Sequence, residues 1–120
     1  MDDERELLRG NTPTLVLAVL QDAPQHGYAI AREINRRSGD KLQCKQGTLY
    51  PALHALERDG LIAGQWEHAE SERPRKVYAI TDAGRKELER RVQTWARFSA
   101  GVAQIIGQNI GGGPAREQTA

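Results

Sequence analysis

Apolar side chains recur at alternating intervals of four and three residues along the last third of the chain, and no other pattern in the sequence limits the fold so much. The pattern is made by Leu88, Val92, Trp95, Ser99, Val102 and Ile106, of which Ser99 is the one polar member, with Phe98 and Ile105 beside it. This spacing forms the seam of a heptad repeat on one long helix. We expect that helix to span residues 81–108 and to be roughly 40 Å long at about 1.5 Å per residue.

The rest of the chain is too small to cover that seam. A preceding domain of about seventy residues does not extend along the whole length of such a helix. A second copy of the same helix does, and identical subunits pair most often through a two-fold interface. The six seam residues together with Phe98 are therefore the predicted dimer interface, and residues 81–108 are the predicted dimerisation helix.

The first helix is predicted from Thr12 to Asp22. Thr12 is a good N-cap, and Pro13 suits the first helical position, where its missing N–H has no partner to lose. The apolar residues that follow lie almost all around this helix, so most of its surface should be buried. Residues 1–11 are expected to form an N-terminal arm or a short helix.

Two more helices should follow. One is expected from Gly27 to Ser38, with Tyr28 facing inward and Gly39 ending the helix in the left-handed conformation. The other is expected between about residues 46 and 59. Pro51 lacks an N–H and is tolerated in a first turn, so we expect the first turn of this helix to include it.

A hairpin completes the domain. Residues 61–68 and 76–80 have the pattern of two strands, and residues 69–75 contain turn-forming side chains. Thr81 is the expected N-cap of the long helix. The fold class predicted is mainly α with a small β-hairpin: a winged helix-turn-helix domain at residues 12–80, followed by a long C-terminal dimerisation helix. Residues 109–120 are rich in glycine at their start and are expected to form a flexible tail.

Charge is distributed unevenly on a nearly neutral chain. The net charge is +1, but residues 32–45 carry five cations and two acids, a local balance of +3. A second cluster, Arg73, Arg75 and Lys76, lies in the expected hairpin. Two positive patches can form a DNA-binding face, although charge alone fits an ordinary solvated surface better.

Composition argues against several other classes of protein. No apolar run approaches the roughly 18 residues of a membrane span, and the acidic start is unlike a secretory signal, so we expect a cytoplasmic protein with no membrane partner. The single cysteine, Cys44, excludes an internal disulfide, and its spacing from His26 and His54 matches no metal site. Without a phosphate-binding glycine loop or a plausible triad, neither an enzyme nor a cofactor is expected.

Short motifs in a fixed order resemble one family. Residues 10–12, followed by HGY at residues 26–28, resemble the opening of PadR-type regulators. QGTLYPAL at residues 46–53 resembles the recognition helix of that family, and residues 75–84 resemble its second wing strand and the start of its dimerisation helix. The single C-terminal helix is similar to the short branch of the family.

This resemblance implies a ligand-responsive repressor that binds a palindromic operator as a homodimer. It also implies a DNA-backbone contact for Tyr50. Some short members bind planar aromatic compounds between aromatic residues at the dimer interface, which makes Trp95 and Phe98 a candidate effector pocket. The alternative is that Trp95 only fills the interface.

Double-stranded DNA is thus the expected partner, read by the third helix in the major groove and contacted by the hairpin. The candidate DNA-binding residues are Tyr28, Lys45, Gln46, Thr48, Tyr50, His54, Arg58, Arg73, Arg75 and Lys76. Thr48 as a helix cap, Tyr50 as half-buried packing and His54 as plain surface are the alternatives. A second possible function is a winged-helix module that binds another protein, because a fold alone does not fix function.

Overall fold

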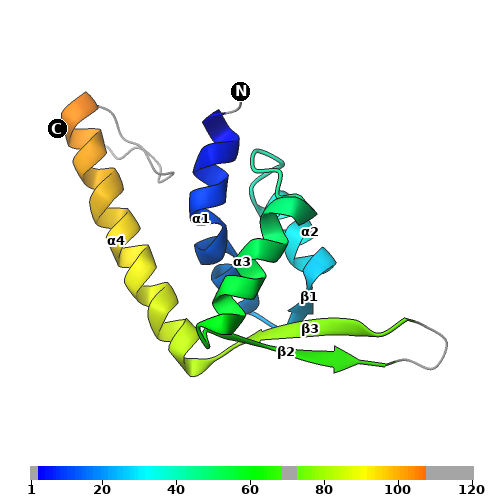
Figure 1. Ribbon diagram of the computed structural model, residues 1–120. Coiled ribbons are helices and arrows are strands. Elements are labelled where there is room, and N and C mark those ends of the chain that lie inside the picture. The colour runs from blue at the N-terminus through cyan, green and yellow to red at the C-terminus, as the bar shows by residue number, and fades with distance from the viewer. Residues whose placement is uncertain (1–2, 69–72, 108–120) are drawn as a thin grey trace. The chain divides into compact units, whose positions relative to one another are not determined.

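The computed structural model describes residues 3–68 and 73–107 and shows a mainly helical chain with one small antiparallel sheet (Figure 1). The helices are α1 (Asp3–Leu20), α2 (Gly27–Arg37), α3 (Gln46–Arg58) and α4 (Asp82–Ile106). The strands are β1 (Gln25–His26), β2 (Ile62–Glu67) and β3 (Arg75–Ile80). The order of three helices, a hairpin and a long helix confirms the predicted winged helix-turn-helix fold class. The expected tail at residues 109–120 lies outside the described residues.

Helix α1 begins at Asp3, so the predicted start at Thr12 is wrong. Thr12 is buried inside the helix, and its hydroxyl donates a hydrogen bond to the Leu8 carbonyl at 2.6 Å. Pro13 is likewise inside the helix and removes one bond from the ladder. A threonine before a proline suits a helix start, but its hydroxyl can equally bond a carbonyl one turn back. Burial of the apolar residues that follow Pro13 stabilises the continuous helix.

Helix α2 and the loop after it follow the prediction closely. The helix spans Gly27–Arg37 with Ser38 as its C-cap, and Gly39 has φ 63°, in the left-handed region. The loop is tied back to the helix: the Asn35 side-chain oxygen accepts from the Cys44 N–H at 2.7 Å. This bond fixes the chain just before α3 begins.

Helix α3 starts at Gln46 with Lys45 as its N-cap, which corrects two expectations. Pro51 is the sixth residue of the helix and lies beyond the first turn. The N–H that proline lacks would have bonded the carbonyl of Gly47, an exposed residue whose carbonyl water can reach. Thr48 is the third helical residue, so it is not the N-cap.

The three-stranded sheet has the order β1-β3-β2, with Trp66 opposite Lys76 and Gly64 opposite Tyr78. Helices α1, α2 and α3 lie on one side of the sheet, and the β2–β3 hairpin extends beyond them (Figure 1). Strand β1 was not predicted, because two residues are too short to show a period. The largest fully buried side chains come from α1, α2, α3 and β2: Leu17, Leu20, Ile30, Leu49, Leu53 and Ile62. Each contributes about 1.5–3 kcal/mol by its burial.

The junction between β3 and α4 is tightly packed. Thr81 is the N-cap predicted for the long helix: its hydroxyl accepts from the Gly84 N–H at 3.0 Å and donates to the Gly60 carbonyl at 2.8 Å. A Cβ on Gly84 would lie 2.1 Å from the Leu61 carbonyl oxygen, so only glycine fits there. Leu88 packs in the core of its own chain, which forms one compact unit up to this residue and a second from Glu89.

Candidate nucleic-acid interface

Helix α3 has one buried and one solvent-exposed face. Its buried residues are Leu49, Ala52, Leu53 and Leu56, at helical spacing. Its exposed residues include four of the predicted DNA contacts: Gln46, Tyr50, His54 and Arg58. Thr48 is half-buried. Because the apolar face holds α3 on the core, the polar face is presented outward as a rigid surface.

Tyr50 packs against the start of α2 while remaining accessible. It is 38% exposed, and a Cβ on Gly27 would lie 2.8 Å from its hydroxyl oxygen and 3.2 Å from its Cζ. Gly27 therefore leaves room for the phenol ring. The ring thus packs as the alternative interpretation expected, while the side chain still reaches solvent, and the DNA contact of Tyr50 stays a prediction. The contact joins the first turn of α2 to the first half of α3.

Tyr28 is 59% exposed, so the expected inward orientation is wrong. The Arg32 guanidinium lies over its ring, with the carbon 5.6 Å from the ring centroid. Sequence reasoning did not select Arg32, although the spacing of four residues between a tyrosine and an arginine on one helix was a usable signal. Within the described part of the chain no carboxylate pairs with Arg32, so its charge faces solvent beside Tyr28.

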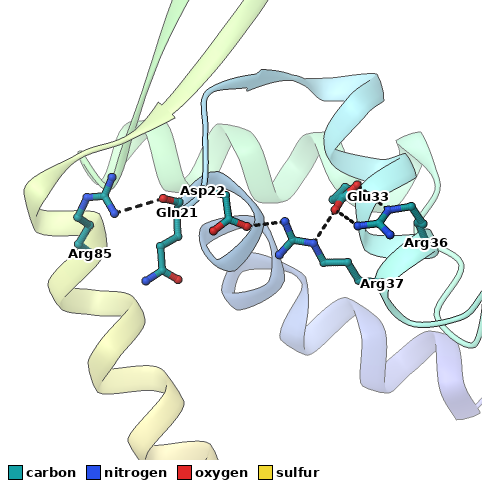
Figure 2. Close-up of polar contacts among 6 residues, drawn as sticks. All are labelled: Gln21, Asp22, Glu33, Arg36, Arg37 and Arg85. Atoms are coloured by element: carbon teal, nitrogen blue, oxygen red, sulfur yellow. Dashed lines mark hydrogen bonds and ion pairs between the residues drawn. The ribbon is translucent and has the colours of Figure 1, made fainter.

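The other arginines of α2 are held by acids. Glu33 accepts from Arg36 and from Arg37 at 2.6 Å each, and Arg37 also bonds Asp22 at 2.6 Å (Figure 2). The Arg36 hydrogen bond, followed by that of Arg37, lowers the pKa of Glu33 from 4.5 to about 2. The local charge of +3 in the sequence thus overstates the positive surface. Lys45, at the start of α3, remains exposed.

The hairpin carries the second group of predicted contacts. Arg73 and Arg75 are exposed. Lys76 differs, because its ammonium donates to Glu57 Oε1 of α3 at 3.0 Å. Arg58 is 3.1 Å from Asp59, but this pair is exposed and contributes little. The structure therefore presents Arg73 and Arg75 to solvent and places Lys76 against α3.

Helix α4 exposes apolar side chains beyond Leu88. The predicted interface residues Val92, Trp95, Phe98 and Ile106 are exposed, Phe98 by 68%, while Ser99 and Val102 are half-buried. Ile105, which flanks the seam, is 85% exposed. Leu88 already lies in the core of its own chain, so the exposed part of the predicted seam begins at Val92.

Neither a metal centre nor a membrane span was found among residues 3–68 and 73–107. No group of three histidine, cysteine, aspartate or glutamate side chains there is arranged to hold an ion. No helix in those ranges is both long and apolar enough to cross a bilayer. Cys44 is buried, and this burial raises the pKa of its thiol.

Known proteins share this arrangement. A transcriptional regulator of Mycobacterium tuberculosis is 36% identical over 84 residues, which are 70% of this chain and 75% of that protein. A solved padr family transcriptional regulator from Eggerthella lenta is 34% identical with a TM-score of 0.75, over 84% of this chain and 86% of its own. A transcriptional regulator from Clostridium thermocellum is 26% identical with a TM-score of 0.76, over 82% and 93% respectively.

The family match covers most of the helices and strands described above. Residues 16–90 fit the model of the transcriptional regulator PadR-like family, from α1 through α3 and the hairpin into α4. The fold, the exposed face of α3 and the sequence match agree, and the chain belongs to the PadR-like family of transcriptional regulators, which act by binding DNA.

Proposed function

We propose that the protein is a ligand-responsive repressor that binds a palindromic operator as a homodimer. The observation that supports this most is the outward face of α3, where Gln46, Tyr50, His54 and Arg58 are exposed on a helix whose other face is buried. A helix held this way can enter the major groove without unfolding any part of the core.

Phosphate contacts supply most of the proposed affinity. Lys45, Arg73 and Arg75 are exposed cations on the loop before α3 and on the hairpin. The Tyr50 hydroxyl can donate to a phosphate oxygen. Arg32 and Tyr28 join this set, because stacking on the ring limits the motion of the guanidinium before DNA arrives.

The outward residues of α3 contact the edges of the bases and supply sequence specificity. Gln46 is the first helical residue, and its amide can donate to and accept from an adenine edge. Thr48 is half-buried and can offer its hydroxyl to a base. His54 and Arg58 continue the exposed face toward the other end of the helix. The N-terminal residues of a recognition helix reach the base edges most directly, so Gln46 is the main specificity residue.

Two subunits pair through the exposed seam of α4 from Val92 to Ile106. Such a dimer presents two α3 helices related by a two-fold axis, and an operator with the same symmetry is a palindrome. A planar aromatic effector bound between Trp95 and Phe98 changes the angle between the two long helices. That change moves the two α3 helices away from the separation of roughly 34 Å that one turn of DNA requires.

The test is a mobility shift with DNA from upstream of the protein's own gene, at several salt concentrations. We expect binding that weakens with salt and exceeds binding to an unrelated duplex by roughly 10³-fold or more. Replacing Gln46 with alanine should erase that preference. Replacing both Arg73 and Arg75 with alanine should weaken binding to all sequences alike and flatten the salt dependence.

The same complexes, titrated with flat aromatic compounds, test the ligand response. In a Trp66→Phe background, an effector in the pocket quenches Trp95 and changes the fraction of DNA bound. Quenching by none of these compounds would remove the pocket from the proposal. Absence of binding to any duplex at low salt would favour the alternative, a winged-helix module that binds a protein.

A further inference from the structure

Lys76 lies at the point where the hairpin meets α3. Its ammonium donates to Glu57 Oε1 at 3.0 Å, and the two side chains are only 28% and 31% exposed. The same ammonium is 6.0 Å from the Trp66 ring centroid and 5.5 Å from that of Tyr78. The Lys76 ammonium is thus bonded to an anion of α3 and lies near two aromatic rings, one from β2 and one from β3.

Strand β2, which pairs with β3, leaves space for the contact between Lys76 and Glu57. Gly64 faces the same side, and a Cβ there would lie 2.4 Å from Lys76 Cε and 3.0 Å from Glu57 Oε2. Any other residue at this position would force the Lys76 side chain to shift. The hydrogen bond to Glu57 also raises the pKa of Lys76, so the ammonium stays charged at neutral pH.

We propose that Lys76 is a positioning residue that binds the hairpin to α3 through Glu57, and that its charge is not used on a DNA phosphate. This inference rests on the proposed function, in which α3 and the hairpin contact one duplex. Glu57 belongs to the second half of α3, and Lys76 is the second residue of β3. The pair therefore sets the angle at which Arg73 and Arg75 stand relative to the exposed face of α3.

The salt dependence of binding separates a positioning residue from a phosphate contact. Each phosphate contact contributes about −0.9 to the slope of log affinity against log salt. Replacing Lys76 with methionine should lower operator affinity roughly three- to tenfold and leave the slope unchanged. The matched control is Arg75→Ala, one residue away, which should reduce the slope.

Glu57 gives a test in which the two roles predict opposite signs. If Lys76 contacted a phosphate, Glu57→Gln would free the ammonium, remove a nearby negative charge and strengthen binding. As a positioning pair, Glu57→Gln instead weakens operator binding, and the swapped variant Glu57→Lys with Lys76→Glu recovers part of it. The probe is a duplex selected from a random pool by the wild-type protein, and melting temperatures show whether each variant folds.

A measurement without DNA tests the positioning role of Lys76 separately from the proposed DNA-binding function. Amide hydrogen exchange in β2 and β3 should accelerate in Lys76→Met and Glu57→Gln and stay unchanged in Arg75→Ala. Unchanged exchange in the first two variants, or a reduced salt slope for Lys76→Met, would overturn the positioning role. If the wild-type protein selects no duplex, the proposed function fails, while accelerated exchange would still establish the contact between hairpin and helix.

Discussion

Gly47 is a position in α3 at which the fold does not require glycine. It is exposed in the first turn of α3, and an added Cβ would meet no atom within 4 Å. Glycine lowers helix stability by roughly 1 kcal/mol relative to alanine, and no contact in the described chain compensates for that loss. In the proposed complex with DNA, the missing side chain would let the backbone of α3 approach base edges beside Gln46.

We expect Gly47→Ala to raise stability and to weaken DNA binding. The unfolding free energy should rise by roughly 0.5–1 kcal/mol, whereas operator affinity should fall because a methyl group stands in the groove. Thermal unfolding and a DNA titration measure the two effects. Gly10→Ala is the matched control, since Gly10 is also helical with open space around it but lies in α1. It should stabilise the protein and leave affinity unchanged; equal affinities for all three proteins would contradict this role for Gly47.

Helical periodicity was enough to predict that Gln46, Tyr50, His54 and Arg58 are exposed on α3, because the buried leucines fix which side faces out. Two features of the site could not be predicted from helical periodicity. The orientation of Tyr28 depends on how α2 is rotated on the core, and a tyrosine fits either face. The pairing of Lys76 with Glu57 joins residues 19 apart in the chain, and no local pattern encodes such a contact.

At the level of elements, the sequence predicted which segments are helices and strands better than where they begin. Proline was the main source of error: Pro13 and Pro51 were both assigned to first turns, yet each lies inside a helix. A missing hydrogen bond is a local cost, and it is outweighed when the helix buries many apolar residues on both sides of the proline. Glycine was a better guide: Gly39 was predicted to end a helix in the left-handed conformation, and its φ is 63°.

Helices α1 and α2 are tied together by one charge network. Arg37 of α2 reaches Asp22, in the turn after α1, and shares Glu33 with Arg36 (Figure 2). Arg85, at the start of α4, adds a bond to the Gln21 carbonyl at 3.4 Å. These contacts hold the turn before β1, and thus the start of α2, in place.

Acid should weaken this network in a defined range of pH. The pKa of Glu33 is lowered from 4.5 to about 2 by its hydrogen bonds to Arg36 and then Arg37. Its carboxylate therefore stabilises the fold fully above about pH 4.5, and this contribution is lost as the pH falls toward 2. We expect Glu33→Gln to have a lower urea midpoint than wild type near pH 7, with the difference vanishing below pH 2.

The control for that experiment is Asp40→Asn, which also removes one acid but lies in the exposed loop after α2. It should change the midpoint little at neutral pH. A difference between wild type and Glu33→Gln that stays constant from pH 7 to pH 2 would show that the carboxylate charge does not stabilise the fold.

At the level of the whole molecule, the net charge of +1 is too small to draw the chain to DNA by itself. Affinity must come from local groups, and a two-fold dimer doubles every one of them. The heptad spacing predicted the apolar seam on α4, and the exposure of Val92, Trp95 and Phe98 is consistent with it. The burial of Leu88 in its own subunit was not predictable, because spacing along one helix does not say which turn still belongs to the preceding core.

The proposed dimer interface along the seam can be tested with two variants, each of which adds one charge on a different side of α4. Trp95 is 47% exposed within the subunit, so Trp95→Glu should leave the subunit folded while placing a charge in the proposed interface. Sedimentation at micromolar concentration should then show a single chain where the wild type shows two. Operator affinity should fall by roughly 10²-fold or more, because the second half-site is no longer bound by a tethered partner.

Gln104 provides the matched control for this variant. It lies nine residues from Trp95, or two and a half turns at about 3.6 residues per turn, and therefore on the opposite side of α4. Gln104→Glu adds the same charge to the same helix and should keep both the dimer and its affinity. If Trp95→Glu also sediments as a dimer, the subunits pair through another surface, and the separation of the two α3 helices must be set there instead of along the seam.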